Sequence, residues 1–256
     1  MYRLIDEQPE FLVIDKAPGI SVHRDQSDAG LAMLLEEARG ESLHMVHRLD
    51  RMTSGLMLFA RNPKAAAQLG ELFRSRQVDK FYLALSDRKP TRKQGLVRGD
   101  MTRGRRGGWR LAKTLVNPAI TQFFSTSVRE GERLFLLRPL TGRTHQLRVA
   151  LKSLGAPIIG DQVYHERTER VEERGYLHAW MLGFELNGRR YRYRGDPQDG
   201  ERFLTGEFRT ALEPWQDPWA LAWPRVPSAH APVGQQCQAS SSGKSGGQPV
   251  NHKTGK

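Results

Sequence analysis

The sequence predicts an α+β fold in which helices flank a mixed, mostly antiparallel sheet. Short apolar runs bounded by glycine or turn residues, at 11–14 and 56–60, are typical of buried strands. Strands also follow one another directly, as expected for 120–128 and 133–137, which are joined through Glu130-Gly131-Glu132. Because strands outnumber helices and come in consecutive pairs, an antiparallel sheet is favoured over alternating strands and helices.

Hydrophobic spacing and turn residues predict the individual elements. Asn62 followed by Pro63 is the expected start of a helix, since asparagine caps helices and proline fits their first turn. Gly40 and Gly155 are the expected stops of two others. In order, we expect a strand at 11–14, a helix over 31–38, a strand at 56–60, a helix from Pro63, strands at 81–85, 120–128 and 133–137, a helix from Thr144, a strand around 191–193 and a last helix over 201–212.

The chain is expected to form one large domain, residues 1–226, because 256 residues suffice for a single mixed core. Three tryptophans, Trp215, Trp219 and Trp223, are expected to pack back onto it. Residues 227–256 consist mostly of Ser, Gly, Gln, Pro and Lys, and they carry almost no large apolar side chain. Such a segment buries too little surface to offset its ordering entropy, so we expect a disordered tail.

The charge balance indicates a polyanionic partner. The formal net charge is +12, which favours binding to nucleic acid over a basic but inert surface or an anionic membrane. No run approaches the ~20 apolar residues of a spanning helix, and the first residues do not resemble a secretory signal. A single cysteine, Cys237, excludes an internal disulfide. We therefore expect a soluble, cytoplasmic protein.

The most informative stretch is His47-Arg48-Leu49-Asp50-Arg51-Met52-Thr53-Ser54-Gly55. The cations on both sides of Asp50 favour its ionised form. The buried strand that follows would present this carboxylate on a loop at the edge of the sheet. An ionised aspartate that binds no metal can accept a proton or attack carbon. The simpler alternative is that Asp50 caps a turn or pairs with Arg48 or Arg51.

Two further motifs accompany this one, and together the three resemble the RluA-type family of pseudouridine synthases. The matching pieces are HRLDRMTSGL, KFYLAL, and LTGRTHQLRV with PIIGDQVY, in that order, and the resemblance extends over residues 11–184. Met52 and Ala150 stand where the family frequently has an acidic residue and a histidine. The chain begins almost directly at the first strand, so it resembles a small form without the N-terminal RNA-binding domain of many relatives.

The resemblance implies the catalytic residues. Asp50 corresponds to the catalytic carboxylate, and Arg143 to the arginine that pairs with it; the alternative for Arg143 is a phosphate contact. Tyr82 corresponds to the tyrosine that stacks on the uracil, against the alternative of core packing. Arg48 corresponds to the arginine that fills the space vacated by the flipped base, and His47 is expected to be structural.

RNA, either rRNA or tRNA, is the implied partner. Nine residues between Arg88 and Arg110 are Lys or Arg, and only Asp100 opposes them. Gly104, Gly107 and Gly108 predict a mobile segment there, which would grip phosphates rather than remain a solvated loop. The expected RNA-binding or base-flipping residues are Arg48, Arg51, Lys80, Arg103, Arg105, Arg106, Arg110, His145 and Arg148.

The implied reaction is the isomerisation of a uridine to pseudouridine, which needs no redox group, nucleotide or metal. The sequence has no Gly-x-Gly-x-x-Gly, no phosphate loop and no cysteine pair. His44 and His47 lack a clustered third ligand, so no metal site is expected. We expect a monomer without cofactor. The competing interpretations are a non-catalytic RNA-binding or ribosome assembly factor on the same fold, and membrane-surface binding, which lacks the expected amphipathic face.

Overall fold

The computed structural model describes residues 1–22, 30–104, 107–165 and 171–227. The chain divides into two units, Met1–Arg225 and Val226–Lys256. In the second unit only Val226 and Pro227 are described, so the expected disorder of 227–256 lies outside the described residues apart from Pro227. All the elements named below belong to the first unit.

Strands dominate the described residues. The helices are α1 (Leu31–Arg39), α2 (Pro63–Arg74), α3 (Gln146–Ser153) and α4 (Gly206–Leu212), with short 3₁₀ helices η1 (Glu201–Phe203) and η2 (Glu213–Trp215). The strands are β1 (Tyr2–Glu7), β2 (Phe11–Lys16), β3 (His44–Met45), β4 (Ser54–Ala60), β5 (Asp79–Ser86), β6 (Gln94–Gly99), β7 (Met101–Arg103), β8 (Trp109–Leu111), β9 (Ala119–Arg129), β10 (Glu132–Pro139), β11 (Leu177–Leu186) and β12 (Arg189–Arg194).

Ten of the described strands form one mixed sheet. Its order is β1-β2-β4-β11-β5-β10-β9-β6, with β12 paired to β11 and β3 paired to β4, and β7 and β8 form a separate hairpin. Within the described part of this sheet, β4 and β11 are the parallel pair, and the other pairings are antiparallel. The predicted α+β fold with a mostly antiparallel mixed sheet is therefore confirmed.

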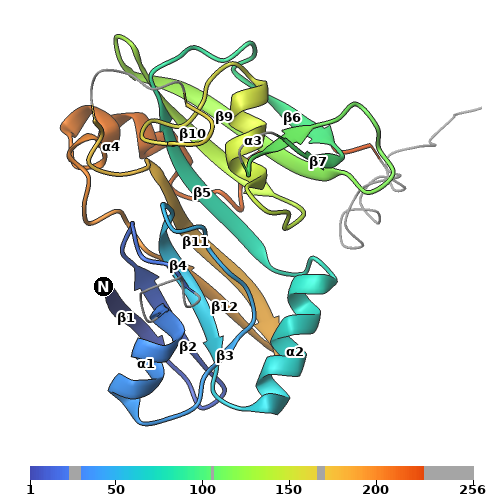
Figure 1. The fold of residues 1–256 in the computed structure, drawn as a ribbon, viewed down its shortest axis with the longest axis vertical. Helices are drawn as coiled ribbons and strands as arrows, with labels where there is room; N and C mark the ends of the chain where they lie inside the picture. Colours follow the sequence, from blue (N-terminus) through green and yellow to red (C-terminus); the bar gives the residue numbers. More distant parts are fainter. Residues whose placement is uncertain (23–29, 105–106, 166–170, 228–256) are drawn as a thin grey trace, which may run out of the picture. The chain divides into compact units, whose positions relative to one another are not determined.

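The helices cover different parts of the sheet (Figure 1). Helix α2 packs on β4 and β11, α3 packs on β9 and β10, and β5 runs from one region to the other. Strand β2 is buried on both faces, because Phe11 and Val13 lie in the core under α2 while Leu12 and Ile14 lie in the core under α1. This double burial explains why the strand is a continuous apolar run rather than an alternating one. No helix in the described ranges is both long enough and apolar enough to cross a bilayer.

Helix α2 begins as its sequence predicts. Asn62 accepts the Ala65 N–H at 2.9 Å, and Pro63 occupies the first turn. The first helix ends at Gly40, which has a φ of 66°. In both helices the local capping residues, and not only the packing, set the ends.

Two predicted helix boundaries are wrong. The helix expected over 201–212 is divided, because Thr205 adopts an extended backbone and accepts the Phe208 N–H at 3.2 Å, so that α4 starts only at Gly206. Helix α3 starts at Gln146 instead of Thr144, because His145 has a left-handed backbone with a φ of 56°. The tryptophans behave as expected: Trp215 is buried in the main core, and Trp219 and Trp223 pack against it.

The arginine-rich segment is more ordered than its composition predicts. Instead of one mobile loop, residues 94–99 form β6 on the sheet edge next to β9, and 101–103 pairs with 109–111 as the β7–β8 hairpin. Val97 is 6% exposed and packs into the main core. The many charged residues around it hide this apolar position when the sequence is read alone. Pairing with β9 is a long-range interaction, which local propensity does not report.

Gly55 permits a close backbone approach between β4 and β11. Its φ is 108°, and a Cβ atom added there would lie 2.2 Å from the Ala179 carbonyl oxygen. Any larger residue would therefore combine backbone strain with a clash against main-chain atoms. Because Gly55 follows the Asp50 loop directly, this approach also locates that loop relative to β11.

We expect Gly55→Ala to lower the free energy of unfolding by about 2–4 kcal/mol, because strain and overpacking act together. The matched control is Gly70→Ala, at a position in α2 where an added Cβ meets nothing within 4 Å. That substitution should raise stability by up to about 1 kcal/mol, since alanine is the better helix residue. Urea unfolding of the three proteins tests both signs, and an unchanged midpoint for Gly55→Ala would contradict the close approach.

Candidate active site

A cleft of about 770 Å³ lies between the two helix-covered regions of the sheet. It is lined by residues 45–50, by residues 139–148 and by facing parts of α2 and β5. Neither Arg51 nor Arg103 nor Arg110 lines it, and Arg105 and Arg106 lie outside the described residues. The expected site residues that do line it are Arg48, Asp50, Lys80, Tyr82, Arg143, His145 and Arg148.

Asp50 occupies a tight turn between β3 and β4. Its carbonyl oxygen accepts the Thr53 N–H at 2.9 Å, and the neighbouring Leu49 is buried in the core under α1. The Asp50 side chain itself is 20% exposed. Buried neighbours thus hold the carboxylate at the cleft surface, where it remains accessible to a substrate.

His47 supports this loop from inside. Its Nε2 atom accepts the Leu58 N–H at 2.9 Å, and its ring stacks on Phe73 with centroids 4.5 Å apart. Burial, together with the charge of Lys80, lowers the pKa of His47 to about 3. A neutral imidazole whose Nε2 is occupied by a main-chain donor fits the structural role expected for it.

Lys16, at the end of β2, holds the other side of the loop. Its buried ammonium donates to the carbonyl oxygens of Ala17 and Ile20, both at 2.9 Å, and to that of Arg51 at 3.4 Å. Burial, followed by the charge of Arg174, lowers the pKa of Lys16 to about 7. The residue after Asp50 is therefore attached to the end of β2 through a single buried side chain.

Arg148, not Arg143, is the arginine that contacts Asp50. Its Nη1 atom lies 3.2 Å from Asp50 Oδ2. The same guanidinium forms a two-pronged pair with Asp161, with Nε at 2.7 Å and Nη2 at 2.8 Å from the two carboxylate oxygens. The Asp161 side chain is fully buried and that of Arg148 is 7% exposed. The predicted ion pair between Asp50 and Arg143 is therefore wrong.

Arg143 lies in the turn that precedes α3 and points elsewhere. Its guanidinium donates to the Asn117 side-chain oxygen, and Arg143 remains part of the cleft lining. The two arginines belong to one sequence motif, and only the start of α3 at Gln146 decides which of them reaches Asp50. The phosphate contact considered as the alternative for Arg143 is compatible with this position.

Tyr82 belongs to β5 and lines the cleft. Its backbone pairs with Leu137 on one side and Ala179 on the other, in the middle of the sheet. The half-buried ring packs against both the main core and the core under α1. Burial, and then the nearby charge of Asp50, raises the pKa of Tyr82, so its phenol stays protonated at neutral pH.

Gln146 fixes the turn that carries Arg143 and His145, a role that sequence reasoning missed. Its Oε1 atom accepts from Thr141 Oγ1 at 2.7 Å and from the Arg143 N–H at 3.0 Å. Its Nε2 donates to the Ile120 carbonyl and to Thr121 Oγ1, both at 3.0 Å. One buried amide side chain therefore attaches the whole turn to β9, in a satisfied polar network.

The cleft is strongly cationic around one acid. Among the described residues that line it, Asp50 is the one carboxylate. Burial lowers the pKa of Lys80 to about 8, and the nearby Arg76 adds to this effect. Sequence reasoning missed Arg74 and Arg76, which follow each other closely at the end of α2. The lining cations are Arg48, Arg74, Arg76, Lys80, Arg143 and Arg148.

The remaining expected RNA-binding residues lie outside the cleft lining. The Arg51 Nε atom donates to the Gly19 carbonyl at 2.9 Å. On the hairpin, the Arg103 guanidinium lies 5.9 Å from the Trp109 ring centroid, and Arg110 Nε donates to Thr102 Oγ1 at 3.2 Å. Both hairpin arginines are exposed, so their heads remain accessible to phosphates.

A buried network supports β4 directly behind the Asp50 loop. Ser54 Oγ lies 2.7 Å from His178 Nδ1 and accepts from Arg174 Nη2 at 2.6 Å, and His178 Nε2 lies 2.6 Å from the Gly195 carbonyl. Burial lowers the pKa of His178 to about 4, so the ring is neutral. These contacts stabilise the parallel β4–β11 crossing.

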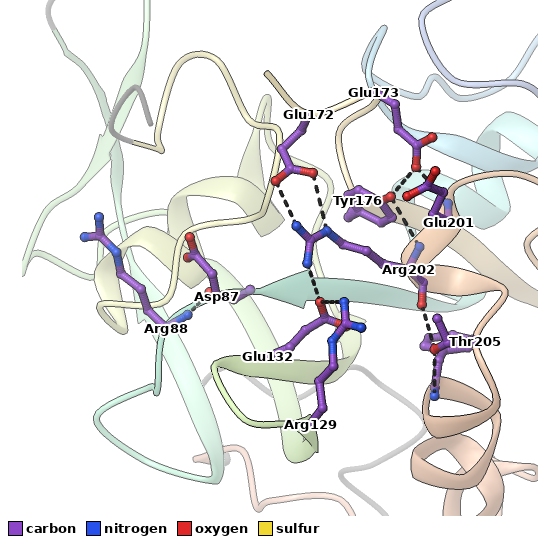
Figure 2. A network of polar contacts seen from close by, with 12 residues as sticks. Asp87, Arg88, Arg129, Glu132, Glu172, Glu173, Tyr176, Glu201, Arg202 and Thr205 are labelled. Atoms are coloured by element: carbon purple, nitrogen blue, oxygen red, sulfur yellow. Dashed lines mark hydrogen bonds and ion pairs between the residues drawn. The ribbon is translucent and has the colours of Figure 1, made fainter. Parts of the chain in front are cut away.

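A second polar network, away from the cleft lining, anchors the segment that enters β11. Figure 2 shows Arg202 between two carboxylates, with Nη1 2.5 Å from Glu132 and Nη2 2.9 Å from Glu172. Tyr176 donates its hydroxyl to Glu173 in the same group. The network joins η1 to the β9–β10 turn, so its role is structural.

Comparisons with known proteins agree with this geometry. A family model described as RNA pseudouridylate synthase matches residues 10–153. A Haemophilus influenzae protein named as an uncharacterized RNA pseudouridine synthase is 48% identical over 183 residues, which are 71% of this chain and 81% of the relative. Ribosomal large subunit pseudouridine synthase C of Rickettsia bellii is 32% identical over 187 residues, 69% of this chain and 61% of that protein.

The solved structures agree as well. The structure of human RNA pseudouridylate synthase domain containing 1 superposes with a TM-score of 0.65 at 26% sequence identity, covering 77% of this chain and 84% of that one. The fold and the site thus define an enzyme of RNA modification. The chain belongs to the RNA pseudouridylate synthase family, and it is an RNA pseudouridine synthase, an isomerase. The resemblance inferred from the three sequence motifs is confirmed.

The environment of Lys16 predicts a pH dependence of stability. Its pKa falls from 10.5 to about 7 on folding, so between these values the unfolded chain binds more protons there than the folded one. Wild-type stability should therefore rise with pH relative to Lys16→Met, with a limiting slope of about 1.4 kcal/mol per pH unit. Below pH 7 the difference should be constant, because both states are then protonated.

Urea unfolding of both proteins between pH 6 and 10 measures this difference. The control is Lys64→Met, at an exposed position of α2, which should follow wild type at every pH. A wild-type minus Lys16→Met difference that does not change with pH would show that the buried ammonium keeps an ordinary proton affinity.

Proposed function

We propose that this enzyme converts a specific uridine in structured RNA, either rRNA or tRNA, into pseudouridine, with Asp50 as the catalytic carboxylate. The observation that carries the proposal is a cleft in which one carboxylate stands among cations, within the described residues. The name of the Rickettsia bellii relative refers to the large ribosomal subunit, which supports rRNA as one of the two substrate classes.

One carboxylate is enough for this isomerisation. Uracil leaves C1′ of the ribose as a stabilised anion, turns and rejoins through C5, so no second acid has to protonate the leaving group. A hydrolytic glycosidase, in contrast, uses a pair of carboxylates across the bond it breaks. Three first steps are consistent with Asp50: attack on the base, attack on the sugar, and removal of the C2′ proton.

The neighbours of Asp50 have distinct parts in this proposal. Arg148, 3.2 Å away, orients the carboxylate. The Tyr82 ring stacks on the uracil, and its protonated hydroxyl can accept the proton that leaves C5 only while it passes its own proton to an acceptor such as water. Both side chains extend from buried secondary structure, which limits their motion during the reaction.

Access to a paired base requires that the nucleotide flips out of its helix, at an unstacking cost of a few kcal/mol. Arg48 is exposed and lines the cleft next to Asp50, so it is placed to fill the vacated space. Other exposed cations, Arg74 and Arg76 on the cleft and Arg103 and Arg110 on the hairpin, bind phosphates on either side in this proposal.

A non-catalytic assembly factor on the same fold is the alternative that the test must exclude. It would need the basic cleft but not an accessible carboxylate. Asp50 is held at the cleft surface by Thr53 and Arg148, and its side chain is 20% exposed there. This arrangement favours catalysis.

Asp50→Asn should abolish pseudouridine formation while the protein still binds RNA. The substitution keeps the shape but removes the charge, so tritium release from C5-labelled RNA should fall by at least about 10³-fold. Arg148 retains Asp161 as its partner, so stability should change by less than about 1 kcal/mol. RNA affinity should be equal or higher, because a negative charge has left the cleft.

The control for this substitution is Asp6→Asn, which makes the same chemical change on β1, where Asp6 contacts Gln8 and Tyr193. It should turn over at the wild-type rate. If wild type releases no tritium from any cellular RNA and Asp50→Asn cells have the same pseudouridine map, the enzyme assignment of Asp50 fails and the assembly-factor interpretation replaces it.

Reversing the hairpin cations, Arg103→Glu with Arg110→Glu, should weaken RNA binding and flatten its salt dependence. The log–log slope should fall by about 0.7–0.9 for each phosphate that the protein no longer binds. The rate at saturating RNA should fall much less, because neither residue lines the cleft. The matched double reversal Lys64→Glu with Arg209→Glu, at exposed positions of α2 and α4, should leave the slope near wild type. Equal slopes for both doubles would show that the hairpin does not touch RNA.

A further inference from the structure

Tyr164 joins the hairpin to the catalytic pair, although it does not line the cleft. It is 7% exposed and follows Asp161 in the segment after α3. We propose that Tyr164 is a positioning residue that couples the β7–β8 hairpin to the Asp50–Arg148 pair and sets the tautomer of His145. The proposal rests on the proposed function, because the coupling matters only if RNA contacts the hairpin while Asp50 acts on the base.

The ring of Tyr164 restrains the Arg148 guanidinium. The guanidinium carbon lies 5.0 Å from the ring centroid, a distance typical of a cation–π contact. Asp161 holds two nitrogens of the same group from its edge. The guanidinium thus has one face on the ring and one edge on Asp161. Its remaining nitrogen, Nη1, is directed at Asp50 Oδ2, 3.2 Å away.

The hydroxyl of Tyr164 has two partners on different elements. The Trp109 N–H donates to it at 2.7 Å, and His145 Nδ1 lies 2.9 Å from it. The oxygen accepts from the amide, and the buried phenol proton needs an acceptor of its own; of these two partners, only Nδ1 can accept, so we assign the proton to the bond with Nδ1. His145 then carries its own proton on Nε2, which makes this cleft-lining residue a donor toward an RNA oxygen.

Two further observations support this assignment. Burial, and then the charge of Arg148, lowers the pKa of His145, so the neutral ring is the relevant species near pH 7. Tyr164 remains a phenol, because burial raises its pKa as well. The hydroxyl can therefore act as a donor to imidazole throughout the physiological range.

The contact from the hairpin uses the main chain. Trp109 pairs with Arg103, and the Gly104 N–H donates to the Gly108 carbonyl at 2.8 Å. This pattern marks a non-hydrogen-bonded pair, in which the Trp109 N–H points out of the hairpin. That outward amide is what Tyr164 binds. Arg103, opposite Trp109, and Arg110, next to it, are exposed, so a phosphate that they bound would lie beside the tethered segment.

Tyr164→Phe tests the coupling, because it keeps the ring under Arg148 and removes the hydroxyl. At saturating RNA we expect kcat to fall about 3- to 10-fold, as for the removal of one or two hydrogen bonds, with RNA affinity changed by no more than about twofold. The matched control is Tyr193→Phe on β12, which removes a hydroxyl that lies 2.6 Å from Asp6 and should keep the wild-type kcat.

A spectroscopic measurement on the RNA-free protein separates positioning from plain stability. In histidine-labelled protein, ¹⁵N spectra should show His145 with Nε2 protonated and Nδ1 bare, its signals identified by their loss in His145→Gln. In Tyr164→Phe the tautomers should mix. Trp109→Pro removes the main-chain donor together with the indole, and Trp109→Ala removes the indole alone. The proline variant, but not the alanine variant, should shift both the tautomer balance and kcat in the same direction as Tyr164→Phe.

Each outcome decides the proposal. An active wild type with unchanged kcat in Tyr164→Phe overturns the coupling and leaves the proposed function intact. A His145 ring protonated on Nδ1 in wild type overturns the hydrogen-bond assignment, whatever the activity. If wild type forms no pseudouridine, the proposed function fails, while the tautomer measurement still decides the assignment of the Tyr164 proton.

Discussion

The structure of the site depends on one buried guanidinium that is divided between two carboxylates. Arg148 is nearly inaccessible, and a buried charge that loses its partner typically costs about 3–5 kcal/mol. Asp161 is the partner that this buried charge needs, because its two oxygens accept from Arg148. Asp161 is itself fixed, since its Oδ1 also accepts the N–H groups of Val163 and Tyr164 at 2.9 and 3.1 Å. The guanidinium therefore stays in place without Asp50, and its last nitrogen is left for Asp50.

Two contacts on the segment after Asp50 help to place it against this fixed group. Just before β4, the Lys16 ammonium holds the carbonyl of Arg51. Within β4, Gly55 lets the strand approach β11 more closely than any residue with a side chain would allow. Strand β11 in turn pairs with β5, which carries Tyr82. The loop, the tyrosine and the arginine thus come from segments far apart in the chain, and the sheet brings them to one cleft.

The sequence predicted those features of the fold and site that depend on neighbouring residues in the chain. The α+β class, the Asn62 cap and the position of Asp50 on a loop before a buried strand follow from short patterns and motifs. It chose the wrong arginine, because Arg143 and Arg148 lie in one motif and the left-handed backbone of His145 moves the start of α3. It also missed the strands in the arginine-rich segment, whose pairing with β9 is a tertiary interaction. Contacts made by main-chain groups, such as the Trp109 amide, leave no trace in side-chain chemistry.

The division of Arg148 between Asp161 and Asp50 also bears on reactivity. A carboxylate paired with an arginine of its own is well oriented, but the full positive charge weakens it as a base and as a nucleophile. Here Asp161 has already neutralised that charge, so the three groups together carry a net charge of −1 when both carboxylates are ionised. Asp50 gains the orientation from a hydrogen bond at 3.2 Å while meeting a smaller net positive field. Three further cations, Arg48, Arg76 and Lys80, belong to other segments of the cleft lining. A phosphate can bind to them without breaking the contact between Arg148 and Asp50. In the proposed function, orientation of the carboxylate and attraction of the RNA thereby belong to different cations.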